Sequence, residues 1–183
     1  MPSPDSTPSC TNSFSVLRKD GPTGAVWSLC GEIDPPMGQS LLHAIYNSDR
    51  GRILFLLETP GGLAHLTLGL LKELEPLAPG LETRAIGSCA SAGVHLLQAG
   101  SRRTAYPHTQ FFTHAISADT VVNTTNAKNV AISFEQDLDA WVEVIRRRTP
   151  KKRPAFWKHW FQLDRYFDAQ EALSLGLIDA IVD

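Results

Sequence analysis

The distribution of apolar residues along the chain predicts strands that alternate with helices. Short apolar runs typical of strands occur at 14–17, 25–33, 53–57, 82–87, 102–106, 110–115 and 177–182. The run ILFLL at 53–57 has no polar interruption, as in a strand that is buried on both faces of a parallel sheet. Apolar residues at helical spacing predict helices over 37–47, 63–77, 90–99, 126–148, 154–163 and 168–176. This alternation predicts an α/β fold with a largely parallel sheet and right-handed crossovers.

Composition and charge limit the size of the protein and its partners. A chain of 183 residues with 43% hydrophobic residues is long enough for one domain, which we place at 14–183. Residues 1–13 are rich in Ser, Pro and Thr and lack periodicity, which predicts a mobile N-terminal tail. The formal net charge of −2 creates no field that would attract nucleic acid or an anionic membrane, so we expect neither as a partner.

Cysteine usage and the absence of targeting segments predict a cytoplasmic protein. The three cysteines are an odd number without paired spacing, which argues against a disulfide framework and favours a reducing compartment. The N-terminus has no basic and apolar regions of a signal peptide, and no apolar run approaches the ~20 residues that span a bilayer.

Three candidate segments follow predicted strands, where functional groups gather in parallel sheets. They are TPGG at 59–62, GSCAS at 87–91, and His114. Ser91 would stand at the start of a helix, where free backbone N–H groups can hold an oxyanion beside the serine. The same small residues could also simply allow tight packing, and Gly61-Gly62 could be an ordinary turn. The residues alone leave both interpretations open, and the G-x-S-x-G pattern is not met because position 89 is Cys.

Among the six histidines, His114 is the one expected at a strand end beside other candidates. His43 and His65 fall within predicted helices, and His95 is expected to be a core residue whose polar groups are satisfied. His108 lies about 20 Å from His114 along an extended strand, too far to share a metal. No paired-cysteine or H-E-x-x-H motif is present, so we expect no metal and no cofactor.

Two acidic residues near the C-terminus could orient a catalytic histidine, Asp164 and Asp168. Asp168 stands three residues before Glu171 at the start of a predicted helix, which is typical of a capping box. That role leaves Asp164 free. The basic run at 146–153, followed by aromatics, could suggest nucleic-acid contact; we favour a structural role at the end of helix 126–148, with the aromatics in the core.

The segments TPGG, GSCASAG, FFTHA and LDRYFDAQEALSLGLIDAIV occur in an order and spacing that resemble the proteolytic subunit of the caseinolytic (Clp) protease family. The resemblance runs from about Cys30 to the C-terminus. It implies a ClpP/crotonase-like spiral of βαβ units with a protruding handle helix at 126–148, and a single ClpP-like peptidase domain over 14–183. It also implies a serine endopeptidase with a Ser-His-Asp triad.

The resemblance assigns each role to a position of this sequence. Ser91 matches the nucleophile, His114 the general base and Asp164 the orienting acid. Gly62 and Ala92 match the backbone donors of the oxyanion hole. The segment expected to bind substrate contains Gly61, Gly62 and Leu63.

The resemblance further implies peptides or unfolded proteins as substrates, a homo-oligomer of heptameric rings that stack in pairs, and an ATP-dependent unfoldase as partner. The chain departs from the family pattern at Ala115-Ile116, where Gln-Pro is usual, and at SADTVVNTT (117–125), where a Gly-rich strand is usual. Gln162-Leu163 replaces an acid–Arg pair, and Thr59 replaces a Ser. These departures predict weaker ring stacking and altered peptide binding.

Other functions remain open at this point. A crotonase-type acyl-CoA enzyme would share the fold and the paired oxyanion donors but needs no triad. A non-catalytic ring subunit would keep the architecture alone. A Ser/Lys signal-peptide peptidase is disfavoured, because no Lys stands at a comparable strand end.

Overall fold

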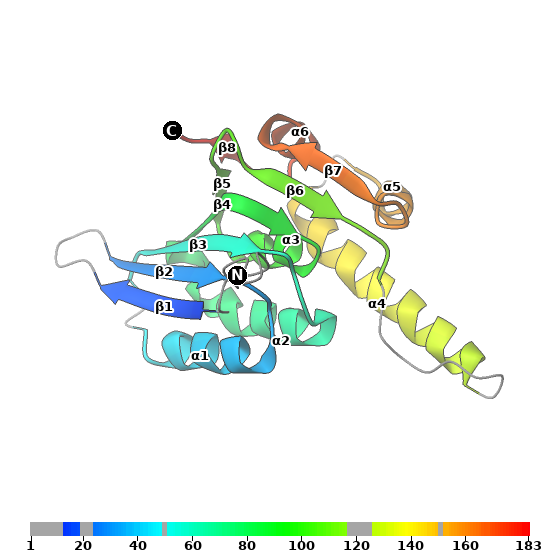
Figure 1. Ribbon diagram of the computed structural model, residues 1–183, viewed down its shortest axis with the longest axis horizontal. Helices are drawn as coiled ribbons and strands as arrows, with labels where there is room; N and C mark the ends of the chain where they lie inside the picture. The colour runs from blue at the N-terminus through cyan, green and yellow to red at the C-terminus, as the bar shows by residue number, and fades with distance from the viewer. Residues whose placement is uncertain (1–12, 19–23, 49–50, 117–125, 150–151) are drawn as a thin grey trace, which may run out of the picture.

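The computed structural model describes residues 13–18, 24–48, 51–116, 126–149 and 152–183 (Figure 1). Its strands are β1 (Ser13–Arg18), β2 (Ala25–Cys30), β3 (Ile53–Thr59), β4 (Leu81–Ala90), β5 (Arg102–Ala105), β6 (Gln110–Thr113), β7 (Arg165–Asp168) and β8 (Ala180–Ile181). Its α-helices are α1 (Pro35–Tyr46), α2 (Ala64–Leu74), α3 (Ala92–Leu96), α4 (Ala127–Arg148), α5 (Pro154–Trp160) and α6 (Ala169–Leu175). Two 3-10 turns follow helices, η1 (Glu75–Gly80) and η2 (Leu97–Ala99).

The sheet is largely parallel, as the sequence predicts. Its strand order is β1-β2-β3-β4-β5-β8, and β6 pairs with both β4 and β7. The pairs β1–β2 and β6–β7 are antiparallel, and the other pairs are parallel. β4 pairs with β5 through residues 82–85 and with β6 through residues 88–90. The end of β4 is therefore held between β3 and β6, which bring further candidate residues to it.

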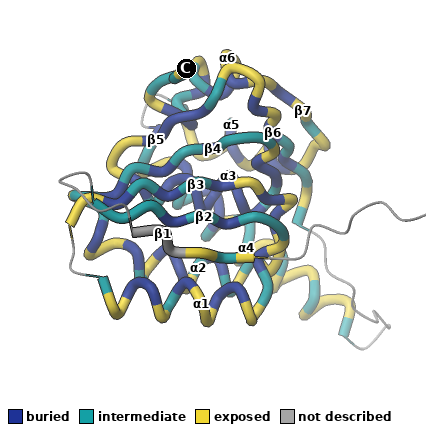
Figure 2. The backbone as a smooth tube through the Cα atoms, turned by 60° about the vertical axis from the view of Figure 1, so that its left-hand side comes forward, coloured by how far each residue is buried: buried dark blue, intermediate teal, exposed yellow. Residues whose placement is uncertain are grey.

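Helices cover the sheet and enclose the core. The helices α1 and α2 lie together along one side of the sheet, and the buried residues follow its central strands (Figures 1 and 2). The largest side chains buried there include Trp27 and Phe55, whose rings pack edge to face at 6.0 Å. No helix in the described part of the chain is long and apolar enough to cross a membrane.

The long helix α4 extends from the body of the protein, with its N-terminal part farthest from the sheet (Figure 1). Toward its C-terminus, Trp141, Val142 and Ile145 are buried. The other apolar positions of the predicted stripe, Val130, Phe134 and Leu138, are half-buried and line a cavity of the same chain. The C-terminal half of the stripe therefore packs on the protein's own core, and its N-terminal half lines the cavity.

The basic run at the end of α4 has structural partners, which confirms the structural interpretation. Arg146 and Arg147 both pair with Glu143. Arg148 donates to the backbone carbonyls of Gly100 and Ser101, 2.6 and 3.2 Å away. These contacts give the three arginines structural partners at the end of α4.

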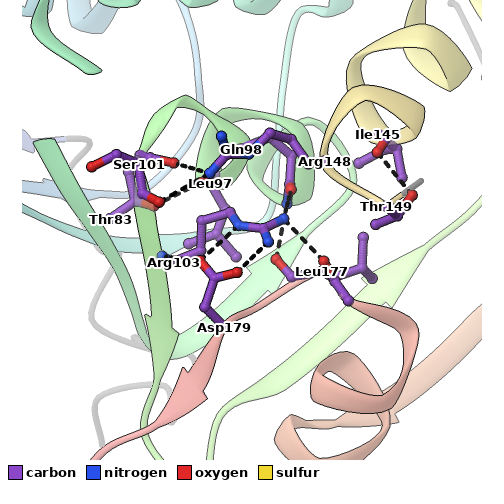
Figure 3. Close-up of polar contacts among 12 residues, drawn as sticks. Thr83, Leu97, Gln98, Ser101, Arg103, Ile145, Arg148, Thr149, Leu177 and Asp179 are labelled. Atoms are coloured by element: carbon purple, nitrogen blue, oxygen red, sulfur yellow. Dashed lines mark hydrogen bonds and ion pairs between the residues drawn. The ribbon is translucent and has the colours of Figure 1, made fainter. Parts of the chain in front are cut away.

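A buried arginine ties β5 to the C-terminal segment (Figure 3). The Arg103 guanidinium donates to the Asp179 carboxylate, to Gln98 Oε1 at 2.6 Å and to the Gly176 carbonyl at 3.0 Å. Burial alone would raise the pKa of Asp179, but the hydrogen bonds and charge of Arg103 outweigh it and hold this pKa below its ordinary value. This network fixes the end of the chain against β5.

Several predicted boundaries are wrong, and one strand was missed. Ala90, expected in a helix, ends β4, and the following helix is α-helical only to Leu96 before it tightens into η2. The last strand is reduced to two residues, and α5 ends at Trp160. Strand β7 was not predicted, because four residues with charges at both ends carry too short an apolar pattern. Ser13, assigned to the tail, begins β1, and the rest of that predicted tail lies outside the described residues.

Candidate active site

Ser91 occupies a strained turn between a strand and a helix. β4 ends at Ala90, α3 begins at Ala92, and Ser91 between them has φ 51° and ψ −121°. Among the described residues, it is the only non-glycine with a positive φ. Such strain costs about 1–3 kcal/mol and is concentrated at functional sites. A sharp strand-to-helix turn of this kind exposes the serine hydroxyl at the end of the sheet, although G-x-S-x-G is absent.

Cys89 and Ser88, the other two residues of the GSCAS motif with a nucleophilic atom, differ from Ser91 in their surroundings. Cys89 is fully buried, and burial raises the pKa of its thiol to about 12, so it stays protonated and unreactive. Ser88 is exposed on β4, one residue farther from the helix. Ser91 is therefore the member of this motif that the local fold presents for chemistry.

The TPGG turn packs directly behind Ser91. A Cβ on Gly61 would lie 2.7 Å from Ser91 Cβ and 3.0 Å from the Ala92 nitrogen, and Gly61 has φ +104°. Thr59 Oγ1 accepts from the Gly61 N–H at 3.0 Å, and a Cβ on Gly93 would lie 2.4 Å from Thr59 Cγ2. The two glycine-containing motifs thus interlock, and the paired glycines are more than an ordinary turn.

The two residues predicted to supply oxyanion donors, Gly62 and Ala92, both lie near Ser91. The Ile33 N–H donates to the Gly61 carbonyl, and the Leu63 N–H donates to the Ile33 carbonyl, at 2.7 and 2.9 Å. In such a bridge the Gly62 N–H points away from Ile33, and Gly62 lines the cavity that contains Ser91. Ala92 is the first residue of α3, so its N–H has no partner within the helix.

His114 lies directly beyond β6 and meets Ser91. Its Nε2 is 2.8 Å from Ser91 Oγ, and its Nδ1 is 2.6 Å from the Ala115 carbonyl oxygen. Because a carbonyl can only accept, Nδ1 carries the proton and Nε2 can accept from the serine hydroxyl. The imidazole stacks on Phe112 at 5.4 Å, and Phe112 stacks on Tyr166 at 4.3 Å. The ring is thus held in the tautomer that a general base needs.

The structure does not join Asp164 to His114. The β6–β7 register ends at Thr113 opposite Arg165, so Asp164 lies across from His114 one residue further on. Asp164 is exposed, and within the described residues it forms neither a hydrogen bond nor an ion pair with His114. Asp168 accepts from the Glu171 N–H at 2.8 Å as N-cap of α6, which confirms its predicted structural role.

A cavity of about 750 Å³ opens beside Ser91 and His114. Of the three residues predicted to bind substrate, Gly62 and Leu63 line this cavity, whereas Gly61 packs behind Ser91. The opposite wall comes from the face of α4 that carries Phe134, Leu138 and Trp141. The sequence shows this apolar stripe but not that it faces the serine.

His95 is buried in the wall of the same cavity, and the expectation that its polar groups are satisfied is wrong. Its Nδ1 is 3.4 Å from the Ser91 carbonyl, but its Nε2 has no hydrogen-bond partner among the described residues. Burial lowers the pKa of His95 to about 3, against a small opposing effect of the Ser91 carbonyl. The imidazole is therefore neutral at physiological pH.

A serine at a strained strand-to-helix turn with a histidine bonded to it, on an α/β sheet, is an arrangement that serine hydrolases also use. The profile of the Clp protease family matches residues 28–183, and the chain belongs to this family. It is 29% identical to ATP-dependent Clp protease proteolytic subunit 6, chloroplastic, of Arabidopsis thaliana over 140 residues, 74% of this chain and 50% of that protein. It is 28% identical to ATP-dependent Clp protease proteolytic subunit 2 of Thermobifida fusca over 148 residues, 80% of this chain and 72% of that protein. The chain thus spans about half the length of the first relative.

Proposed function

We propose that this protein is a serine endopeptidase that cleaves peptides or unfolded proteins. The observation that carries the proposal is the 2.8 Å contact between Ser91 Oγ and His114 Nε2 at a strained strand-to-helix turn. Neither a packing role nor acyl-CoA chemistry requires a histidine that accepts from this hydroxyl. Membership of the Clp protease family supports the same conclusion.

The geometry supports a two-step reaction. His114 Nε2 takes the proton from Ser91 Oγ while the oxygen attacks the substrate carbonyl. The N–H groups of Gly62 and Ala92 hold the oxyanion that forms. His114 then protonates the leaving amine, and water hydrolyses the acyl-enzyme with His114 again as the base. Asp164 remains the predicted orienting acid, because catalytic hydrogen bonds often form fully only when substrate is bound.

We propose that the enzyme works as a ring-shaped homo-oligomer. Both relatives are named as proteolytic subunits of ATP-dependent Clp proteases, which supports an ATP-dependent unfoldase as partner. A ring of seven subunits is what the resemblance to the family implies. The protruding part of α4 is the segment available for contacts between rings (Figure 1). The cytoplasm remains the predicted location, although one relative is named as chloroplastic. Light scattering should give a mass well above that of one 20.1 kDa chain.

A fluorophosphonate probe followed by peptide mapping tests the chemistry. We expect labelling at Ser91, and loss of both labelling and peptide cleavage in Ser91→Ala. Ser88→Ala removes an exposed hydroxyl three residues away and is the matched control, which should label normally. Labelling that persists in Ser91→Ala would refute the assignment. Acyl-CoA binding without any labelling would favour a crotonase-type enzyme, and rings without labelling a non-catalytic subunit.

A further inference from the structure

The cavity beside Ser91 has a one-sided distribution of charge. Two carboxylates line it, Glu32 and Asp137, whereas no Lys or Arg of the described residues does. The Asp137 side chain is only 14% exposed, and its partner is His65 Nε2 at 3.6 Å. His65 is 77% exposed and carries a charge only when protonated. Asp137 is thus a largely covered carboxylate in the cavity wall, and its partner His65 lies at the long distance of 3.6 Å. A carboxylate in this position can accept from a cationic ligand.

His95 is a second group in the cavity wall, and one of its nitrogens lacks a hydrogen-bond donor. His95 is 2% exposed, and its Nδ1–H donates to the Ser91 carbonyl, so the unpartnered Nε2 is an acceptor. The ring packs edge to face with Trp141 at 3.6 Å between centroids. Trp141 and Asp137 are four residues apart and share one face of α4. The wall therefore combines a charged acceptor, a neutral acceptor and an indole ring.

These groups match a cationic side chain. A lysine or arginine could lay its apolar stem along Phe134 and Leu138 and place its donors against Asp137 and His95. The indole of Trp141 would add a cation–π contact. A carboxamide could use His95 Nε2 and the unpartnered Trp141 Nε1–H, but it would leave the Asp137 charge without a cation. The charge in the cavity thus favours a basic side chain over a neutral polar one.

We infer that this cavity selects peptides with a lysine or arginine next to the cleaved bond, and that Asp137 is the specificity-determining residue. This inference rests on the proposed function, because it takes Ser91 as the nucleophile that fixes where the cleaved bond lies. It names the class of substrate residue that enters the cavity.

Peptidyl diphenyl phosphonates test the inference, because they react with the serine nucleophile and carry a chosen side chain into this cavity. We would measure rates of Ser91 labelling by arginine-type, glutamine-type and leucine-type phosphonates, each divided by the rate with a small fluorophosphonate. The arginine-type probe should be fastest in the wild type. Asp137→Asn should slow it by roughly tenfold or more, as expected for loss of a charged hydrogen bond. The leucine-type rate should fall far less, so the ratio of the two rates should decrease.

Matched variants separate specificity from damage to the fold. Asp137→Glu keeps the charge and should retain the preference. Glu135→Gln removes a carboxylate of α4 that does not line the cavity, and it should behave as the wild type. If Asp137→Asn does not fold, Ser133→Lys gives the same test from an exposed lining position, because its cation should repel the arginine-type probe.

The outcomes distinguish the inference from the proposed function. Faster labelling of the wild type by the leucine-type or glutamine-type probe overturns the inference while Ser91 still reacts with the small fluorophosphonate. An arginine preference that survives in Asp137→Asn also overturns it. Absence of any reaction of Ser91 with the small fluorophosphonate would instead refute the proposed function.

Discussion

Replacing His95 with phenylalanine should change how the stability of this protein depends on pH. His95 is fully buried, and burial lowers its pKa from 6.5 to about 3. Once the chain unfolds, the imidazole titrates near 6.5. Between pH 6.5 and about 3 the imidazole is protonated in the unfolded state but not in the folded state. A fall in pH over this range therefore favours unfolding. Above pH 6.5 the neutral His95 imidazole costs the folded protein nothing in this respect. Below pH 6.5 the free energy of unfolding falls progressively, because the unfolded chain gains the proton.

The size of the effect follows from the difference in pKa. Each pH unit below 6.5 costs about 1.4 kcal/mol in the free energy of unfolding. At pH 5 the His95 term therefore amounts to roughly 2 kcal/mol relative to pH 7.5. Phenylalanine is of similar size, cannot titrate, and removes the buried nitrogen that lacks a partner. Between pH 7.5 and pH 5, the free energy of unfolding of His95→Phe should therefore decrease by about 2 kcal/mol less than that of the wild type.

Urea unfolding followed by tryptophan fluorescence at pH 7.5, 6 and 5 measures this difference. Protein concentration must be held constant, because the stability of an oligomer depends on it. His43→Gln removes an exposed histidine of α1 and is the control, which should keep the wild-type pH dependence. Parallel stability profiles for His95→Phe and the wild type would show that His95 is not a neutral buried group, and the reasoning would fail.

Two further predictions concern the N-cap of α6 and the handle helix. Asp168→Ala removes the hydrogen bond to the Glu171 N–H, and it should lower the free energy of unfolding by about 1 kcal/mol. The folded enzyme should retain its turnover. A large fall in turnover without loss of stability would contradict this prediction. Ile132→Asp should lower the mass found by light scattering, because Ile132 is 43% exposed on the protruding part of α4. An unchanged mass would exclude this face of α4 from contacts between subunits.

The fold was predictable where the apolar pattern is long. The run at 53–57 and the repeat along 126–148 gave β3 and α4 with small errors at the ends, because many side chains of each share one environment. The pattern fails where pairing with distant residues decides the local structure. β7 exists because Arg165–Asp168 pairs with β6, and Ala90 is extended because it pairs with Phe112. Neither pairing has a signal within the segment itself.

The sequence predicted which residues form the candidate site, but it did not predict the hydrogen bonds that these residues make. Strand ends indicated Ser91, His114 and the paired glycines, and the structure brings these together. The unpartnered nitrogen of His95 could not be foreseen, because a buried histidine in a helix carries no sequence sign of its missing partner. The bond from His114 to the Ala115 carbonyl depends on the backbone conformation after β6 and is likewise invisible in the sequence.

Asp164 provides the last and most demanding prediction. The His114 Nδ1–H donates to the Ala115 carbonyl, 2.6 Å away. The carboxylate of Asp164, across from His114 in the strand register, is the alternative acceptor that we predict for the substrate complex. Both select the same tautomer, but only the carboxylate carries a charge that stabilises the imidazolium formed during the reaction.

If Asp164 moves onto Nδ1 when substrate binds, Asp164→Asn should slow turnover by at least about a hundredfold; loss of this acid in a serine-protease triad costs ~10⁴-fold. The free energy of unfolding should change by less than about 0.5 kcal/mol, because Asp164 is exposed. Asp168→Asn is the matched control, since asparagine caps a helix as well as aspartate and the same charge is lost. The readouts are kcat for peptide cleavage and the rate of fluorophosphonate labelling. A decrease of less than tenfold in both would mean that the Ala115 carbonyl alone orients His114, and that the enzyme works with a Ser91–His114 dyad.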